Sequence, residues 1–172
     1  MISTNQLRIR QATIQDLDIL TRFSAAMALE TEHRQLDVSR LRLGTQAVID
    51  RPERGKYYVA DLHRNASADT VTVGQLLITY EWSDWRNAQF WWIQSVYVEP
   101  AWRRQGVYRA MHRAVMTLAQ SRADVCGVRL YVEGDNRIAQ GVYERVGLTP
   151  STYRIFESDF VLPKPSPPGH NS

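Results

Sequence analysis

The sequence has a single cysteine, Cys126, so an internal disulfide bond is excluded. We expect this thiol to be a small buried hydrophobic side chain in a reducing compartment. Long hydrophobic runs are also missing, because no stretch approaches the roughly 20 apolar residues of a membrane span. The N-terminus lacks the apolar core of a signal peptide. We therefore expect a soluble cytoplasmic protein without a membrane partner.

A strong excess of charge is absent as well. The net charge of +3 comes from 21 Lys and Arg residues against 18 Asp and Glu residues, so we do not expect nucleic acid as a partner. A nucleic-acid-binding module is the weaker alternative, since the aromatic spacing matches no base-stacking platform. The histidines lack metal-ligand spacing, so we expect no bound metal. They lie at His33, His63, His112 and His170.

The chain does have enough apolar sequence for one core. Its 172 residues, 44% of them hydrophobic, suit a single domain, which we place over residues 1–162. Residues 163–172 are rich in proline and poor in apolar side chains, so we expect a disordered tail.

Hydrophobic periodicity predicts a mixed α/β domain. Thr13 offers a capping hydroxyl with Asp16 three residues on, which predicts a helix start. The order of elements favours antiparallel hairpins followed by crossover helices, hence one mostly antiparallel sheet with helices on both faces. We expect strands at residues 7–10, 57–62, 71–82, 89–98, 125–132 and 153–156, and helices after 13–16 and at 39–50, 107–121 and 136–146.

The junction after the strand at residues 89–98 predicts an anion site. Apolar residues at helical spacing begin at Val107, directly after Arg103, Arg104, Gln105 and Gly106. The first N–H groups of a helix have no internal partners and attract anions. Nearby guanidinium groups match phosphate oxygens, so a pyrophosphate is the expected ligand. On charge and spacing alone, a solvated arginine loop with a turn-forming glycine stays an open alternative.

A second motif follows the next predicted strand. The pattern Asn-x-x-Ala-x-x-x-Tyr-x-x-x-Gly-Leu begins at Asn136 and ends at Leu148. Together with Arg-x-x-Gly-x-Tyr at residues 103–108, it resembles the GCN5-related N-acetyltransferase (GNAT) family. That family has Gly or Ala in place of Tyr108 and Phe in place of Leu148. We expect the Tyr108 ring near the cofactor groove, either stacked alongside it or turned outward.

The resemblance implies a central sheet with a splayed strand pair at the cofactor site. It also implies acetyl-CoA as acyl donor, an amine as acceptor, and direct transfer in a ternary complex. A non-catalytic acyl-CoA-binding or regulatory module, with a groove narrowed by Tyr108, is the alternative. The cofactor-binding residues implied are Val96, Tyr97, Val98, Arg103, Arg104, Gln105, Gly106, Val107, Tyr108, Arg109, Asn136, Ala139 and Tyr143.

Acetyl transfer needs an oxyanion donor, an acid for the leaving thiolate and a base for the amine. The resemblance places the oxyanion donor on a backbone N–H of residues 96–98. Tyr143 resembles the family's general acid, with core packing as the alternative, and Asn136 either contacts the cofactor or caps a helix. Among Glu30, Glu32 and Glu81, we prefer Glu81 as base because aromatic residues surround it.

Four tryptophans gather in and beside the predicted hairpin, at Trp82, Trp85, Trp91 and Trp92. Because side chains alternate along a strand, Trp91 and Trp92 must face opposite sides of the sheet. These tryptophans would suit binding of an aromatic or cationic amine, and the alternative is packing in the core or, where they are exposed, in a homodimer. Small amines, amino acids, antibiotics and proteins all stay open as acceptors, and we favour a small molecule.

Overall fold

The computed structural model describes residues 6–63 and 70–162, which form one five-stranded sheet. The predicted turn at 64–69 and the predicted tail at 163–172 lie outside the described residues. Successive strands are neighbours, and all pairs are antiparallel except β4 with β5, which is parallel. The strands are β1 (Leu7–Gln11), β2 (Lys56–His63), β3 (Thr70–Ser83), β4 (Ala88–Val98) and β5 (Val125–Leu130).

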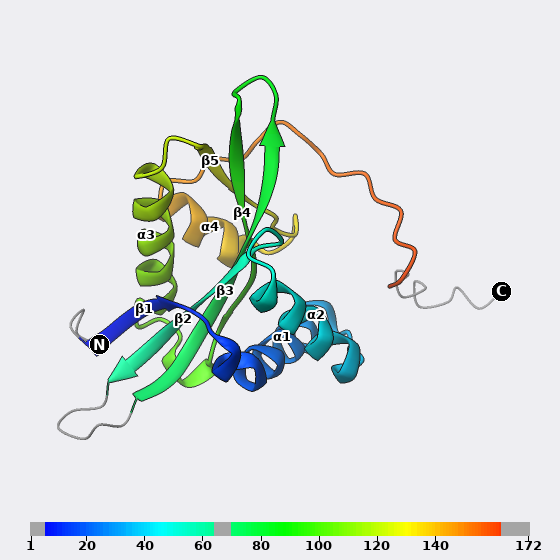
Figure 1. Ribbon diagram of the computed structural model, residues 1–172, viewed down its shortest axis with the longest axis vertical. Coiled ribbons are helices and arrows are strands. Elements are labelled where there is room, and N and C mark those ends of the chain that lie inside the picture. The colour runs from blue at the N-terminus through cyan, green and yellow to red at the C-terminus, as the bar shows by residue number, and fades with distance from the viewer. Residues whose placement is uncertain (1–5, 64–69, 163–172) are drawn as a thin grey trace.

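Helices cover both faces of this sheet, as the sequence predicts (Figure 1). On one side lie α1 (Leu17–Glu32) and α2 (Val38–Asp50). On the other lie α3 (Val107–Gln120) and α4 (Arg137–Arg145). No helix among the described segments is long and apolar enough to cross a membrane.

Alternation along the strands divides the core into two layers. On β2, Tyr57 and Val59 pack in the cluster that includes Leu20 of α1, whereas Tyr58 and Ala60 pack in the cluster that includes Met111 of α3. Because successive side chains point to opposite faces, one apolar strand serves both layers. The run of buried residues in β2 is therefore explained by helices on both sides.

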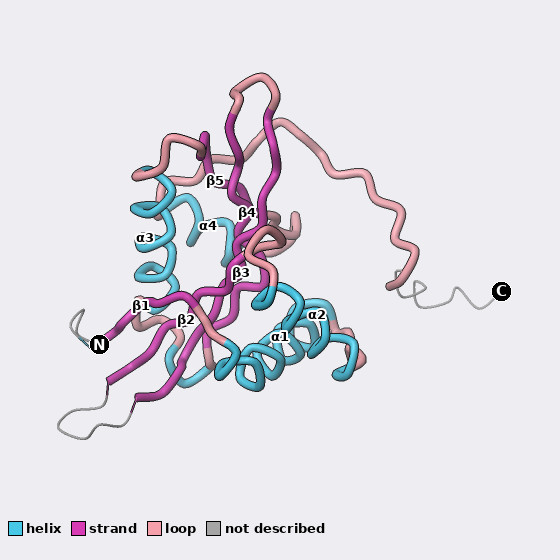
Figure 2. The backbone as a smooth tube through the Cα atoms, in the orientation of Figure 1, coloured by secondary structure: helices cyan, strands magenta, loops and turns pink. Residues whose placement is uncertain are grey.

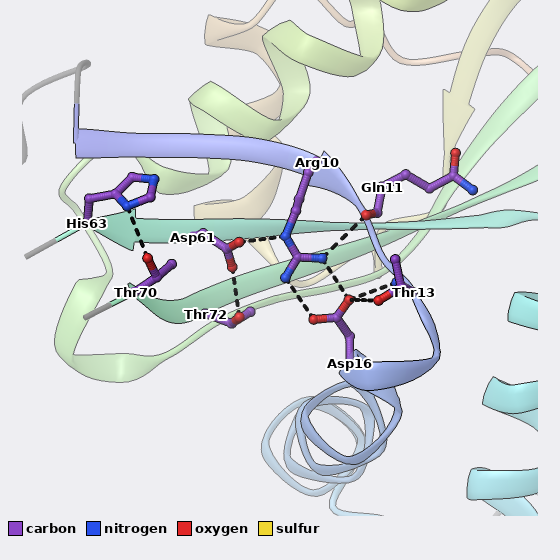
Figure 3. A network of polar contacts seen from close by, with 8 residues as sticks. All are labelled: Arg10, Gln11, Thr13, Asp16, Asp61, His63, Thr70 and Thr72. Carbon is purple, nitrogen blue, oxygen red and sulfur yellow. Dashed lines mark hydrogen bonds and ion pairs between the residues drawn. The ribbon is translucent and has the colours of Figure 1, made fainter. Parts of the chain in front are cut away.

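A polar network joins β1 to β2, β3 and the residues just before α1 (Figure 3). Arg10 of β1 donates to Asp61 on β2, with 2.6 Å between Nε and Oδ2, and to both oxygens of Asp16 at 2.7 and 2.8 Å. Thr72 of β3 donates to the other Asp61 oxygen at 2.8 Å. The capping box of Thr13 with Asp16 is present in the short 3₁₀ helix Ile14–Asp16, which confirms that prediction. We call Arg10, Thr13, Asp16, Asp61 and Thr72 the Arg10 cluster.

The C-terminal part of the described chain corrects the sequence analysis. The strand predicted at residues 153–156 is wrong, because the described chain from 149 to 162 runs as loop and contains no strand (Figure 2). Its apolar side chains stay exposed, Phe156 at 94% and Phe160 at 93%. Local strand propensity forms no strand without a partner edge. The domain boundary at residue 162 stays a prediction.

Candidate functional site

The predicted splayed pair is formed by β4 and β5. Their ladder ends at Ile93 and Leu130, where β5 stops, whereas β4 continues to Val98. Residues 94–98 therefore lose their β5 neighbour while remaining in the sheet through β3. A strand edge without a neighbour presents backbone donors and acceptors that a ligand can pair with.

A β-bulge lies at the start of this free edge. Gln75 pairs with Tyr97 and Leu77 with Gln94, so one β3 residue faces two on β4, Ser95 and Val96. Ser95 has φ of 48°, a left-handed conformation that is uncommon for any residue except glycine. Bulges of this kind bend a strand and re-aim its backbone groups. The bulge lies next to the point where β5 leaves.

The loop after β4 also has unusual backbone geometry. Arg104 has φ of 63°, and Gly106, the N-cap residue of α3, has φ of 89°. Loops with left-handed residues turn successive N–H groups toward one concave side, where anions bind. The first N–H groups of α3 follow directly, so this loop and helix present a set of backbone donors. The helix start at Val107 is confirmed.

Gly74 brings α3 close to the free edge of β4. A Cβ on Gly74 would lie 3.1 Å from the Tyr97 carbonyl oxygen and 3.2 Å from Cγ1 of Val107. A side chain at this position would therefore require Tyr97, Val107 or a neighbour to shift by a few tenths of an ångström. Glycine at position 74 keeps the helix N-terminus beside the splayed strand.

The three arginines of the loop have different surroundings. Arg103 is paired, since its Nε donates to the Val98 carbonyl at 2.8 Å and its Nη2 donates to Glu30 at 2.6 Å.

Arg104, in the loop, and Arg109, in the first turn of α3, are exposed. Arg109 reaches back over the N-cap, with Nη2 3.8 Å from the position of a Cβ on Gly106. Arg104 and Arg109 are thus better placed for a ligand than Arg103. Gln105 donates to the Ala101 carbonyl at 2.9 Å.

Tyr97 and Glu30 join α1 to the splayed part of β4. The Tyr97 hydroxyl donates to Glu30 at 3.0 Å, and the ring packs on Phe23 at 5.1 Å between centroids. Burial and this carboxylate raise the pKa of Tyr97. Burial acts to raise the pKa of Glu30, but hydrogen bonds from Arg103 and Tyr97 hold it below its usual range. Glu30 therefore stays ionised near neutral pH and holds Arg103.

The second motif forms α4 beside α3. Asn136 is the N-cap, and its Oδ1 accepts from the Ala139 N–H at 3.0 Å, so the capping alternative is confirmed. Tyr143 is partly buried, and burial raises its pKa. A phenol in this state is fully protonated at neutral pH, which a proton donor requires.

Tyr108 takes a position that the sequence does not reveal. Its ring packs edge-on against Tyr143, with 5.7 Å between centroids, and near His112 at 5.9 Å. Its hydroxyl is buried without a hydrogen-bond partner, and burial raises the pKa of Tyr108. Of the two orientations that the sequence left open, the outward one is therefore wrong.

Glu81 lies in an aromatic cluster on the helix α1 side of the sheet. Its Oε1 and Oε2 each accept from Arg129 Nη1 at 3.0 Å, and Oε2 also accepts from Trp92 Nε1. Arg129 lies 3.6 Å above the Phe90 ring, and Trp92 stacks on Tyr131 at 4.2 Å. The carboxylate is thus already paired, and its role as base stays a prediction.

The tryptophan prediction is confirmed by this arrangement. Trp91 is buried in the core cluster that α3 shares, whereas Trp92 bonds Glu81 on the opposite face. Trp82 and Trp85 are exposed, at 59% and 86%. Nowhere in the described chain do three His, Cys, Asp or Glu side chains gather as a metal-ligand set.

The sequence analysis missed Gln75, Ser24 and Gly74. Gln75 is fully buried, and its Nε2 donates to Ser24 Oγ at 2.9 Å and to the Ser95 carbonyl at 3.2 Å. The only signal was a Gly-Gln pair inside an otherwise apolar strand, which is a weak sign of close backbone approach. The contact with the bulge depends on strand register and could not be read from the sequence.

Comparison with known proteins agrees with this geometry. The model of the acetyltransferase (GNAT) family matches residues 23–148. The crystal structure of "a possible acetyltransferase from Clostridium difficile 630" is 34% identical, covers 91% of this chain and 99% of its own, and superposes with a TM-score of 0.82. No curated protein matches the sequence.

Two more distant structures share the fold. A predicted acetyltransferase from Clostridium acetobutylicum, solved with acetyl-CoA, is 14% identical over 88% of this chain and 96% of its own, with a TM-score of 0.69. An aminoglycoside acetyltransferase from an uncultured soil metagenomic sample, solved with sisomicin, is 16% identical over 92% and 98%, with a TM-score of 0.69. The chain belongs to the GNAT acetyltransferase family.

Proposed function

We propose that this acetyltransferase moves the acetyl group of acetyl-CoA to a small-molecule amine, directly and in a ternary complex. The observation that carries the proposal is the free edge of β4 at residues 94–98, beside the left-handed loop and the N-terminus of α3. These features supply backbone donors for an extended amide-containing arm and a cationic end for a pyrophosphate. The structure from Clostridium acetobutylicum, solved with acetyl-CoA, supports the same donor.

The donor fits the residues present. Arg104 and Arg109 are exposed beside Gly106, whose lack of a side chain leaves the backbone open. The N–H groups of residues 96–98 would pair with the acyl-carrying arm, and one of them would donate to the carbonyl oxygen as it gains charge. Acetyl-CoA supplies an activated thioester, and the protein supplies position and hydrogen-bond donors.

The proton transfers are assigned to side chains. A neutral amine forms the new C–N bond with the acetyl carbon while the C–S bond breaks and its electron pair stays on sulfur. Tyr143 donates its proton to that sulfur. Glu81 accepts the surplus amine proton through water, because its carboxylate has about four acceptor sites and keeps room beside Arg129 and Trp92.

The acceptor is proposed to be a small amine bound on the aromatic side of the splayed strands. Trp92 stacks on Tyr131 directly after β5 ends, so aromatic surface borders the place where the strands separate. Ring faces attract ammonium groups before they lose a proton. The metagenomic relative that was solved with the amine sisomicin supports a small-molecule acceptor.

Calorimetry with acetyl-CoA at moderate salt tests the donor, and CoA release across an amine panel tests the transfer. We expect saturable one-site binding and turnover with at least one amine.

Tyr143→Phe should lower kcat by about 10²-fold with little change in donor affinity. Tyr153→Phe, at an exposed loop residue, is the matched control and should match the wild type. Full turnover by Tyr143→Phe, with chemistry limiting the rate, would remove the acid assignment.

We also propose a cytoplasmic homodimer. The exposed Trp82 and Trp85 offer apolar surface at the tip of the β3–β4 hairpin. Light scattering should give twice the mass of 19.8 kDa, and a monomer at all concentrations would contradict the dimer.

A further inference from the structure

Gln75 is a costly residue at its position in β3. The side chain has no exposed surface, and its Oε1 is buried without a partner. A buried acceptor without a hydrogen bond destabilises the folded state, whereas the amide nitrogen of the same side chain donates to two acceptors. The amide nitrogen, and not the amide oxygen, therefore accounts for glutamine at this position.

The orientation of the Gln75 amide is fixed by its partners. The Ser95 carbonyl can only accept, so the amide nitrogen and not the oxygen must face it. The second amide hydrogen goes to Ser24 Oγ on α1. Ser24 is itself buried. The amide is thus held from α1 and holds the bulge of β4.

Holding the Ser95 carbonyl also sets the direction of the next N–H. The peptide bonds are trans, so the Ser95 carbonyl and the Val96 N–H point in opposite directions from one plane. β3, which carries Gln75, lies on one side of β4, and β5 has left the other side. Anchoring the carbonyl on the Gln75 amide therefore turns the Val96 N–H away from that amide, which also contacts Ser24 on α1.

We propose that Gln75, held by Ser24, is a positioning residue that keeps the Val96 N–H aimed into the opening between β4 and β5. The inference rests on the proposed function, because it identifies Val96 as the backbone donor to the reacting carbonyl oxygen. Ser95 adopts its left-handed φ of 48° only while the surroundings enforce it. Without the Gln75 bond, the Ser95 peptide can rotate and the donor is misplaced.

Gln75→Met tests the proposal, since methionine matches the length of glutamine but has no amide. We expect kcat to fall about 10- to 100-fold, because misplacing one oxyanion donor has that effect. The Kd for acetyl-CoA should change less than about threefold, and Tm should stay within about 4 °C of the wild type. Ser24→Ala, which leaves the Ser95 contact in place, should lower kcat by less than Gln75→Met.

Thr21→Val is the matched control. Thr21 is buried on the same helix as Ser24, and its hydroxyl donates only to the Leu17 carbonyl at 2.7 Å. This variant loses a buried polar group near the site without touching the bulge, so its kcat should stay near the wild-type value. An unchanged kcat in folded Gln75→Met, or a Kd that rises in step with the fall in kcat, would overturn the proposal.

A backbone measurement separates this inference from the proposed function. In the protein without ligand, backbone NMR shifts should report a positive φ at Ser95 in the wild type and in Thr21→Val. In Gln75→Met they should report a negative φ. A positive φ that persists in Gln75→Met would refute the positioning role whether or not the protein acetylates any amine. A lack of acetyl-CoA binding in the wild type would instead refute the proposed function.

Discussion

The Arg10 cluster and the arginine loop at residues 103–109 contain the same kind of side chain in opposite states. Arg10 uses its guanidinium on two carboxylates that are 6% and 4% exposed, Asp16 and Asp61. In the loop only Arg103 is engaged, while Arg104 and Arg109 remain at the surface beside backbone N–H donors. Charge is neutralised internally in one region and left available in the other.

This contrast separates structural arginines from those suited to a ligand. The partly buried ion pairs of Arg10 join β1, β2 and the start of α1, and every carboxylate oxygen in them accepts a hydrogen bond. Uncompensated cations at a helix N-terminus stabilise a bound anion instead. The first arrangement predicts effects on folding, and the second predicts effects on donor binding.

The largest expected effect is from Arg10→Met. Removing the guanidinium leaves Asp16 and Asp61 buried without a counter-charge, which should lower the free energy of unfolding by about 3 kcal/mol. Urea denaturation measures this loss, and acetyl-CoA affinity of the folded protein should not change. Arg42→Met, at an exposed pair with Asp18, is the control and should cost less than about 1 kcal/mol. A higher Kd for acetyl-CoA in folded Arg10→Met would contradict the assignment of Arg10 to folding alone.

The double variant Arg104→Ala with Arg109→Ala should act on binding alone. We expect the Kd for acetyl-CoA to rise about 10- to 100-fold, equivalent to about 1.4 to 2.7 kcal/mol, with Tm unchanged. The difference should shrink as salt is raised, because both side chains are exposed. Arg113→Ala removes an exposed charge one turn further along α3 and should have little effect. An equal loss in Arg113→Ala would mean that net charge and not position binds the donor.

Much of the fold, and part of the candidate site, could be predicted from the sequence. Apolar alternation and apolar β-rich runs located β1 to β5 to within two residues at each end, because strands of a sheet that helices cover are rich in apolar and β-branched residues. The Thr13 and Asp16 capping box, the start of α3 at Val107 and the opposite faces of Trp91 and Trp92 followed from local rules. The splayed pair followed from the family resemblance and is confirmed.

The features that were not predicted depend on contacts between distant segments. The bulge at Ser95 is held by Gln75 and Ser24, and the inward packing of Tyr108 depends on Tyr143 in another helix. Neither contact leaves a periodic pattern in the sequence. The predicted strand at residues 153–156 failed for a related reason, since a strand requires an edge to pair with as well as suitable residues.

Acid should weaken the Arg10 cluster. The hydrogen bond from Arg10 lowers the pKa of Asp16, although burial opposes it. A carboxyl with a lower pKa in the folded state than in the unfolded state stabilises the protein above about pH 4, and this stability is lost as pH falls through the folded pKa. Unfolding at a series of pH values should show a smaller loss in Asp16→Asn than in the wild type. An identical pH dependence would mean that Asp16 contributes nothing.

The smallest effect is expected from Thr72→Val, which opens the Arg10 cluster at one point. Thr72 gives Asp61 a single hydrogen bond of 2.8 Å, while Arg10 still neutralises the charge on the same carboxylate. Losing a hydrogen bond to a charged group, with the ion pair intact, should cost about 1.5 kcal/mol in urea denaturation. A loss as large as that of Arg10→Met would show that the cluster depends on complete hydrogen bonding more than on charge. The Arg10 cluster and the arginine loop would then differ in how many of their donors and acceptors are paired. The carboxylate oxygens of the cluster are all paired, whereas Arg104 and Arg109 keep donors for a ligand.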